Sequence, residues 1–446
     1  MKKILLTLAA IAAVSILQTR TANAQQSLTD SLFQSISVLQ ADHENTKSDI
    51  ELIKRLKVTG YIQAQWQLAD TAGINSFSGG NFVKTTDNRF AVRRGRVKFT
   101  YDYNFTQFVL QLDATEKGVS IKDAYVAVME PWAQFATLTA GVFDRPFGYE
   151  ISYSSSTRET PERARAFQSL FPGERDLGAK ITLQPKKGTR YDFIKLDAGF
   201  FAGNGINPEF DTKKDFIGHL AVAKANVAQT FKYGLGVSYY DGGLFQATKY
   251  VYNAAKLSDG SNMAFLVDST STNKNAYAKR QYMGVDAQFS LQSAIGITTV
   301  RAEYLTGKQP GSSATNQSTN SATAPTTDTY NREFSAGYVY FIQNIGDTKN
   351  QLVVKYDWYD PNTKVSGNEI VGKSSTGKST KLTANDIKFS TLGLGWNYRF
   401  NSQVKFTAFY EIVKNETTGI SGALATNNYT KDLKDNVLTL RVQYKF

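Results

Sequence analysis

A period-two alternation of apolar and polar residues recurs from residue 56 to the end of the chain. The closing segment, residues 438–446, shows it most clearly, with Leu, Leu, Val, Tyr and Phe on one face and Thr, Arg, Gln and Lys on the other. Successive side chains of a β-strand point to opposite faces, so this period predicts strands with one apolar and one polar face. The chain is therefore predicted to be all-β over most of its length.

Sixteen such segments occur, and the separators between them alternate between short turns and long loops. The segments centre near residues 62, 96, 110, 124, 139, 180, 196, 221, 236, 286, 301, 337, 355, 394, 409 and 441. The long separators cover 69–88, 144–175, 242–279, 308–330, 361–385 and 416–434. An even number of strands of about 10 residues, with short turns at one end and long loops at the other, predicts a 16-stranded antiparallel transmembrane β-barrel. Closure is required because an open sheet edge in hydrocarbon leaves backbone groups unpaired.

The alternative is a secreted soluble β-sandwich or propeller, which would bury its apolar face in a packed core. Tyr, Phe and Trp are instead frequent near the segment ends, as expected for the aromatic girdles of a membrane barrel. The composition excludes several other classes of protein. The chain has no cysteine and two histidines, which excludes a disulfide framework and a His-rich metal site. A mean hydropathy of -0.34 excludes a multi-span helical protein. We favour the barrel.

Residues 1–24 have the three parts of an export signal: Lys2 and Lys3, an apolar run over 4–17, and the small-residue cleavage site 22–24. An uncleaved anchor is the alternative, but 14 residues are too few to span a bilayer of about 30 Å. Removal of Lys2, Lys3 and Arg20 lowers the net charge from +12 to +9. For an exported chain, this charge predicts anionic solutes or anionic lipid as partners and no nucleic acid.

Residues 25–55 are predicted to form a separate amphipathic helix. Positions spaced alternately four and three apart form a heptad seam: Leu32, Ile36, Leu39, His43, Thr46, Ile50 and Ile53. The seam could lie on the rest of the protein, or it could form a coiled coil between protomers with His43 or Thr46 setting the register. The narrow seam favours the coiled coil. We therefore expect an oligomer, most simply a homotrimer.

One long loop, residues 144–176, differs from the others. It contains several aromatic residues and five arginines, whereas 308–330 is almost entirely Ser, Thr, Asn, Ala and Pro. A polar low-complexity segment predicts a mobile exterior loop. Aromatic side chains instead fit a loop folded against the inner wall, where it would narrow the lumen.

The order of these parts resembles the phosphate-selective porin O and P family over nearly the whole mature chain. The resemblance is carried by RRGRVKF (93–99), KDAYV (122–126), GVFDRPFGYE (141–150), SSSTRETPER (154–163), PGERDLG (172–178) and a C-terminal Phe. It implies a trimeric sixteen-stranded channel whose third loop is the constriction, and an arginine ladder with a basic central site that conducts anions.

Eight cations are the candidate anion contacts of the pore. They are Arg94, Arg96 and Lys98 on the second strand, and Arg145, Arg158, Arg163, Arg165 and Arg175 in the loop. Lumen-facing guanidiniums lower the barrier for anions and suit bidentate phosphate contacts. The loop departs from the family pattern because its six acids give it a net charge of −1, and no lysine-rich phosphate trap is visible. In the alternative, loop arginines pair with neighbouring acids, such as Arg158 with Glu159 or Glu162, and hold the shape of the loop.

These observations predict a porin in the outer membrane of a Gram-negative bacterium, surrounded by lipid and lipopolysaccharide. It would be a passive diffusion channel for small hydrophilic solutes that prefers anions, either phosphate or other inorganic anions. No enzyme activity, cofactor or metal is predicted. The alternative is a non-selective or closed barrel that serves as an adhesin or structural scaffold. A barrel hydrolase would need His219 beside a serine and a carboxylate, which no local motif supports.

Overall fold

A computed structural model describes residues 31–47, 49–51, 53–257, 263–346, 348–421 and 427–446. The predicted export signal, residues 1–24, lies outside the described residues. The chain divides into two units, Met1–Lys57 and Val58–Phe446, and each is described by itself.

The described part of the first unit is helical over residues 31–47, 49–51 and 53–54. Its apolar seam is open to solvent in the single chain, with exposed fractions of 58% for Leu32, 47% for Ile36 and 67% for Leu39. Among the described helices of the protein, none has the length and apolar character needed to cross a bilayer. The helix therefore presents an uncovered apolar stripe.

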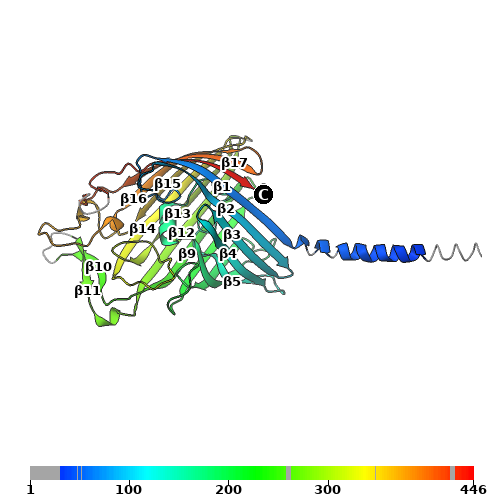
Figure 1. The fold of residues 1–446 in the computed structure, drawn as a ribbon, viewed down its shortest axis with the longest axis horizontal. Helices are drawn as coiled ribbons and strands as arrows, with labels where there is room; N and C mark the ends of the chain where they lie inside the picture. Colours follow the sequence, from blue (N-terminus) through cyan, green and yellow to red (C-terminus); the bar gives the residue numbers. More distant parts are fainter. Residues whose placement is uncertain (1–30, 48, 52, 258–262, 347, 422–426) are drawn as a thin grey trace, which may run out of the picture. The chain divides into compact units, whose positions relative to one another are not determined.

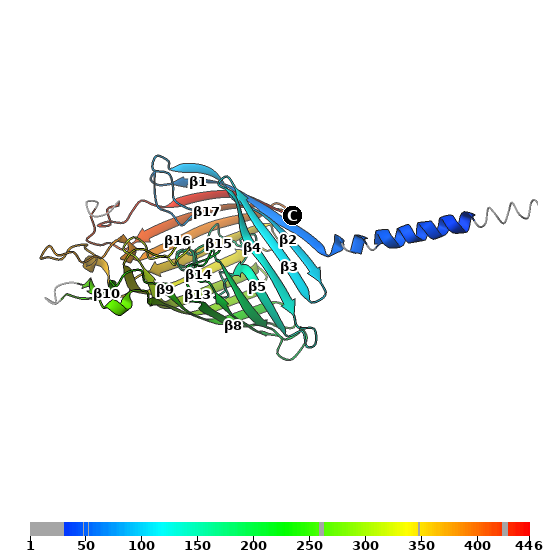
Figure 2. The same ribbon diagram turned by 60° about the horizontal axis from the view of Figure 1, so that its bottom comes forward.

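The second unit is built from antiparallel strands that follow one another around a ring (Figures 1 and 2). The first nine are β1 (Leu56–Ala69), β2 (Asn88–Tyr103), β3 (Thr106–Thr115), β4 (Gly118–Met129), β5 (Ala136–Asp144), β6 (Arg175–Leu183), β7 (Ile194–Phe201), β8 (Asp215–Ala225) and β9 (Phe231–Phe245). The other seven are β12 (Tyr277–Ser293), β13 (Gly296–Gly311), β14 (Thr329–Asn344), β15 (Asn350–Asp360), β16 (Phe389–Arg399), β17 (Val404–Asn415) and β18 (Val437–Lys445).

The ring closes because the first strand pairs with the last. β1 and β18 are antiparallel from Tyr61↔Lys445 to Ala69↔Val437. β9 pairs directly with β12, so the short strands β10 (Val251–Lys256) and β11 (Met263–Asp268) form a hairpin in the loop between them (Figure 1). The predicted 16-stranded antiparallel barrel is confirmed, and each predicted segment centre falls inside a strand.

The barrel has polar side chains inside and apolar side chains outside. On β18, Thr439, Arg441 and Gln443 are 0%, 6% and 4% exposed, whereas Leu440 and Val442 are 43% and 39% exposed. A soluble sheet would show the reverse, so the exposed apolar belt identifies a barrel surrounded by lipid. Barrels of this kind belong to the outer membrane of Gram-negative bacteria, and the predicted location is confirmed.

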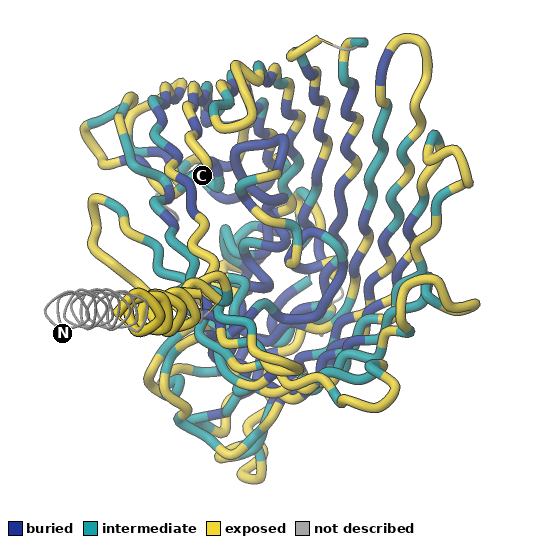
Figure 3. The backbone as a smooth tube through the Cα atoms, turned by 90° about the vertical axis from the view of Figure 1, so that its right-hand side faces the viewer, coloured by how far each residue is buried: buried dark blue, intermediate teal, exposed yellow. Residues whose placement is uncertain are grey.

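The loop between β5 and β6, residues 145–174, here called loop L3, is mostly buried. It contains the short helix α2 (Arg165–Leu170), and Figure 3 shows dark blue, buried chain inside the ring of strands. Its apolar side chains pack against aromatic residues of the inner wall, including Tyr240 on β9, Tyr282 on β12 and Phe334 on β14. The sequence pattern placed the aromatic residues of the strands on the outer surface, so this inner aromatic wall is a finding of the structure.

Candidate functional site

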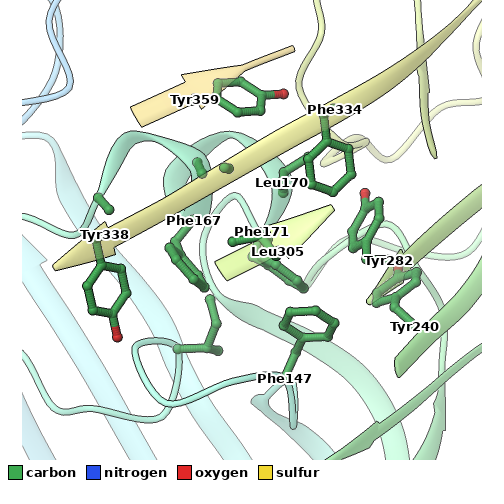
Figure 4. Packing of buried hydrophobic residues seen from close by; sticks show 14 of the residues in the cluster. Phe147, Phe167, Leu170, Phe171, Tyr240, Tyr282, Leu305, Phe334, Tyr338 and Tyr359 are labelled. Carbon is green, nitrogen blue, oxygen red and sulfur yellow. The ribbon is translucent and has the colours of Figure 1, made fainter. Parts of the chain in front are cut away.

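The aromatic side chains of loop L3 fix its path through the barrel. Phe147 and Phe171 meet the ring of Tyr282 edge-on, with centroids 6.3 and 5.7 Å away. Phe167 meets Tyr338 edge-on at 5.7 Å. Figure 4 shows these side chains within the cluster. Edge-to-face pairs at these distances are favourable beyond the burial of their area. Loop L3 is therefore packed against the inner wall of the barrel and does not cross the lumen as an isolated segment.

Two carboxylates anchor the backbone of loop L3 to the wall. Glu303 on β13 accepts the N–H groups of Tyr149 (3.2 Å) and Glu150 (3.1 Å) and the hydroxyl of Tyr338 (3.0 Å). Gly148 has φ +61°, and a Cβ at this position would overlap Oε1 of Glu303. Only glycine combines that backbone conformation with such a close approach.

The second carboxylate belongs to the loop itself. Glu150 accepts the hydroxyl of Tyr340 on β14 and the N–H of Ala164 at 3.2 Å. Burial raises the pKa of Glu150, against the opposing effect of nearby Arg158. A buried carboxyl in such a network contributes to stability only while its partners are in place.

The strands at the closure of the ring carry a group of cations, here called the basic wall. Its members are Arg93, Arg94, Arg96 and Lys98 on β2, Lys405 on β17 and Arg441 on β18. Glu162 of loop L3 points at this wall and accepts from Arg93 at 2.8 Å, Arg94 at 2.7 Å and Arg441 at 3.0 Å. One negative charge is thus shared by three guanidiniums.

Burial alone would raise the pKa of Glu162, but the charges of Arg93, Arg94 and Arg441 outweigh it and hold the pKa well below 4.5. The carboxyl is therefore ionised at neutral pH. Three cations and one anion leave a positive excess at this point of the lumen.

The rest of the basic wall adds to this excess. Arg96 pairs with Asp113 on β3 at 2.8 Å and donates to the hydroxyl of Ser155 at 3.0 Å. Lys98 shares the inner face with Arg96, is half-buried and forms no ion pair with any described residue. Lys405 donates to the carbonyl oxygen of Arg158 at 2.8 Å. Lys98 and Lys405 thus have no carboxylate partner in the part of the chain that the structure describes.

Three of the predicted loop arginines act as ties within the structure. Arg175 pairs with Asp123 and Glu174, each at 2.8 Å. Arg163 also pairs with Glu174 and donates to three backbone carbonyl oxygens of the loop. Arg145 is fully buried, 4.0 Å from Asp176, and donates to a carbonyl oxygen at 3.0 Å. These side chains are engaged in holding the loop.

Two other loop arginines have no acidic partner among the described residues. Arg158 is 2% exposed, and none of its guanidinium nitrogens makes a hydrogen bond. The neighbouring pairs considered from the sequence do not form, because Glu159 binds Arg301 at 2.7 Å and Glu162 binds the basic wall. The guanidinium of Arg165 lies over two aromatic rings, those of Phe77 and Phe389.

The sequence interpretation missed Arg441, Lys405 and the anchoring carboxylate of Glu303. A signal for each was present, because the period-two pattern places all three on the polar face of their strands. The pattern does not indicate which of the polar-face residues have a functional role. Thr, Gln and Arg alternate there without any local mark of function.

The wall opposite β2 carries acids. β12 lies eight strands away from β2 around the ring, and its Asp286 is bonded to His219 of β8 at 3.0 Å. Ser238 pairs with His219 in the β8–β9 register, but its hydroxyl accepts the N–H of Gly148 at 2.8 Å and makes no bond to the imidazole. No described group of three or more His, Asp or Glu side chains is placed to hold a metal ion.

Comparison with solved structures places the fold among porins. OprB of Pseudomonas putida matches with a TM-score of 0.55 at 9% identity, covering 91% of this chain and 97% of that one. An anion-selective porin from Comamonas acidovorans matches with a TM-score of 0.51 at 10% identity, covering 88% and 99%. No family model matches the sequence, and no curated protein matches it. At these identities the likeness establishes the porin fold.

Proposed function

We propose that this protein is a passive outer-membrane channel for small hydrophilic solutes and that it prefers anions. The observation that carries the proposal is the unequal ion pairing of the basic wall. Glu162 and Asp113 are paired with four arginines, while Lys98 has no ion pair among the described residues. A positive excess in a narrow, low-dielectric passage lowers the barrier for anions and raises it for cations.

The identity of the anion, phosphate or another inorganic anion, also belongs to this proposal. The resemblance to the phosphate-selective porin O and P family supports it, as does the capacity of guanidinium groups for bidentate contact with phosphate. The Comamonas acidovorans porin is an example of this fold with anion selectivity. No catalytic role is part of the proposal.

A homotrimer is proposed as well. The exposed heptad seam of the N-terminal helix supports it, because an apolar stripe of this spacing is stabilised when it packs against copies of itself.

The test is ion selectivity in planar bilayers under a salt gradient. We expect a reversal potential of the sign for anions, and a Lys98→Gln variant should shift it toward zero because it removes an unpaired lumen cation. Lys117→Gln is the matched control, since Lys117 is exposed in the turn between β3 and β4. A cation preference in the unsubstituted protein would refute the proposal, and so would an equal shift in both variants.

A closed barrel acting as an adhesin or scaffold is the second candidate. The observation in its favour is the extent of the apolar core that loop L3 forms with the inner wall. Single-channel conductance separates the two candidates, because a closed barrel gives no steps of current in any salt.

A further inference from the structure

A cavity of about 800 Å³ lies where several long loops meet helix α2 of loop L3. This volume is within the range of about 300–1,000 Å³ that is typical of ligand sites. Amide side chains supply much of its polar lining, namely Asn75, Asn81, Gln168, Asn316, Gln317 and Asn385. Rings of Phe77, Tyr359, Phe389 and Tyr429 supply much of the apolar lining. The surface is therefore mostly neutral, with many donors and acceptors beside aromatic faces.

Arg165 is the charged member of the described lining, and its guanidinium has aromatic neighbours but no polar partner. The guanidinium carbon lies 4.5 Å from the ring centroid of Phe77 and 4.0 Å from that of Phe389. The side chain makes no hydrogen bond or ion pair with a described residue, its Nε is enclosed without a partner, and the residue is 9% exposed. Because Nε is enclosed and two aromatic rings lie close to the guanidinium carbon, the two terminal nitrogens are the part of the side chain left to bind a partner.

The acids nearest to Arg165 do not supply that partner. Asp357 and Glu411 form ion pairs with Lys355 at 3.0 and 3.3 Å. Asp435 shares a small neighbouring cavity with Arg165 but forms no ion pair with it. A nearly buried guanidinium with neighbouring aromatic rings and unpartnered terminal nitrogens is a binding feature for a carboxylate, the planar anion that two guanidinium N–H groups can bind in bidentate fashion.

We propose that this cavity binds a polyhydroxylated carboxylate, such as a uronic acid. Its carboxylate meets the edge of Arg165, its hydroxyls exchange hydrogen bonds with the amide side chains, and its apolar C–H face packs on the aromatic rings. The inference names a class of organic solute captured at the loop end of the barrel. It does not depend on the ion preference proposed for the lumen.

The test is isothermal titration of the full-length protein in mild detergent with three probes: D-glucuronate, D-glucose and acetate. Glucose lacks the carboxylate and acetate lacks the hydroxyls. We expect saturable binding of glucuronate, and affinities for glucose and acetate that are each lower by about tenfold or more, as the loss of a charge-assisted bidentate contact or of several hydrogen bonds predicts. Equal binding of glucose and glucuronate would overturn the proposal in favour of a neutral-sugar site. Equal binding of acetate would overturn it in favour of a simple anion site, and absence of binding would overturn it outright.

Two variants locate the site. Arg165→Gln should weaken glucuronate binding by about tenfold or more. Gln317→Glu should weaken it severalfold, because it adds a negative charge to the lining at a side chain with no hydrogen bond to a described residue. Gln317→Glu therefore tests the location of the site if Arg165→Gln fails to fold.

Arg190→Gln is the matched control and should leave affinity unchanged, since Arg190 is exposed in the turn between β6 and β7. Equal affinity in all three variants would refute the assignment. Titration needs no conducting channel, so a failure of the ion-preference proposal is distinguishable from a failure of this one.

Discussion

Replacing Glu162 by glutamine tests the electrostatics of the lumen most directly. The substitution keeps the shape and one acceptor oxygen but removes the charge shared by Arg93, Arg94 and Arg441. The positive excess of the basic wall then grows by one unit. Anions should therefore enter more readily and cations less readily.

The size of the effect follows from Coulomb's law. For an anion that passes about 8 Å from this carboxyl position, one unit of charge changes the energy by about 0.5 kcal/mol in a water-like medium and about 2 kcal/mol at an effective dielectric constant of about 20. These energies correspond to a rise of about twofold to thirtyfold in the permeability of the anion, and the permeability of a cation should fall by the same factor. Added salt should diminish the effect because the screening length is about 10 Å at 0.1 M.

Removing one partner of a buried ion pair also costs stability, by about 3–5 kcal/mol where no other acceptor remains. Here Gln63 accepts from Arg94 at 3.0 Å and Gln65 accepts from Arg441 at 3.0 Å. We therefore expect a loss below that range and a folded barrel. Heat-modifiable migration on a gel checks this before any electrical measurement.

The assay is the reversal potential of Glu162→Gln in a potassium chloride gradient, beside the unsubstituted protein. Glu209→Gln is the control, because Glu209 is exposed in the loop between β7 and β8. The expected shift is toward stronger anion preference in Glu162→Gln alone. An unchanged potential, or a shift toward cations, would show that ions do not pass this carboxyl and would refute the reasoning.

Three further predictions follow from single sites. Gly148→Ala should displace loop L3 and give larger, noisier current steps, because the new Cβ overlaps a wall carboxylate. Gly188 also has a positive φ but lies in open space, so Gly188→Ala should not have this effect; recordings in which the two variants match would contradict this. Ile36→Lys on the helix seam should reduce the oligomer seen by sedimentation in detergent, and the neighbouring Ser37→Lys should not; a monomeric unsubstituted protein would end the coiled-coil hypothesis. Burial raises the pKa of Asp435 to about 6, so its ionisation lowers stability as pH rises between about 4 and 6. Asp435→Asn should therefore raise stability at pH 7.5 by on the order of 1–3 kcal/mol and lose this gain near pH 4, as measured by thermal unfolding; a gain equal at both pH values would contradict the ionisation argument.

The inner aromatic wall shows where sequence reasoning was incomplete. Tyr338 and Tyr340 lie on the inner face of β14, and both are buried against loop L3. Their neighbours on the outer face, Val339 and Phe341, are exposed to lipid. A strand that is apolar on both faces carries no alternation, so its inner side was not distinguishable from its outer side until the loop was placed.

The sequence by itself determined the number of strands, the two faces of each strand that alternates, the turn and loop pattern, and the distinctive character of loop L3. These properties are local, because strand alternation and turn length are set by residues next to one another in the chain. They sufficed for the barrel and for its location in the membrane.

Only the tertiary structure decided which cation meets which acid. Glu162 and Arg441 are 279 residues apart and meet because ring closure places β18 beside β1 and β2. By contrast, Arg158 stands next to Glu159 in sequence and does not pair with it, because Arg301 of a distant strand takes that carboxylate. Ion pairing over such separations depends on register and on the path of the inner loop, and neither leaves a local pattern in the chain.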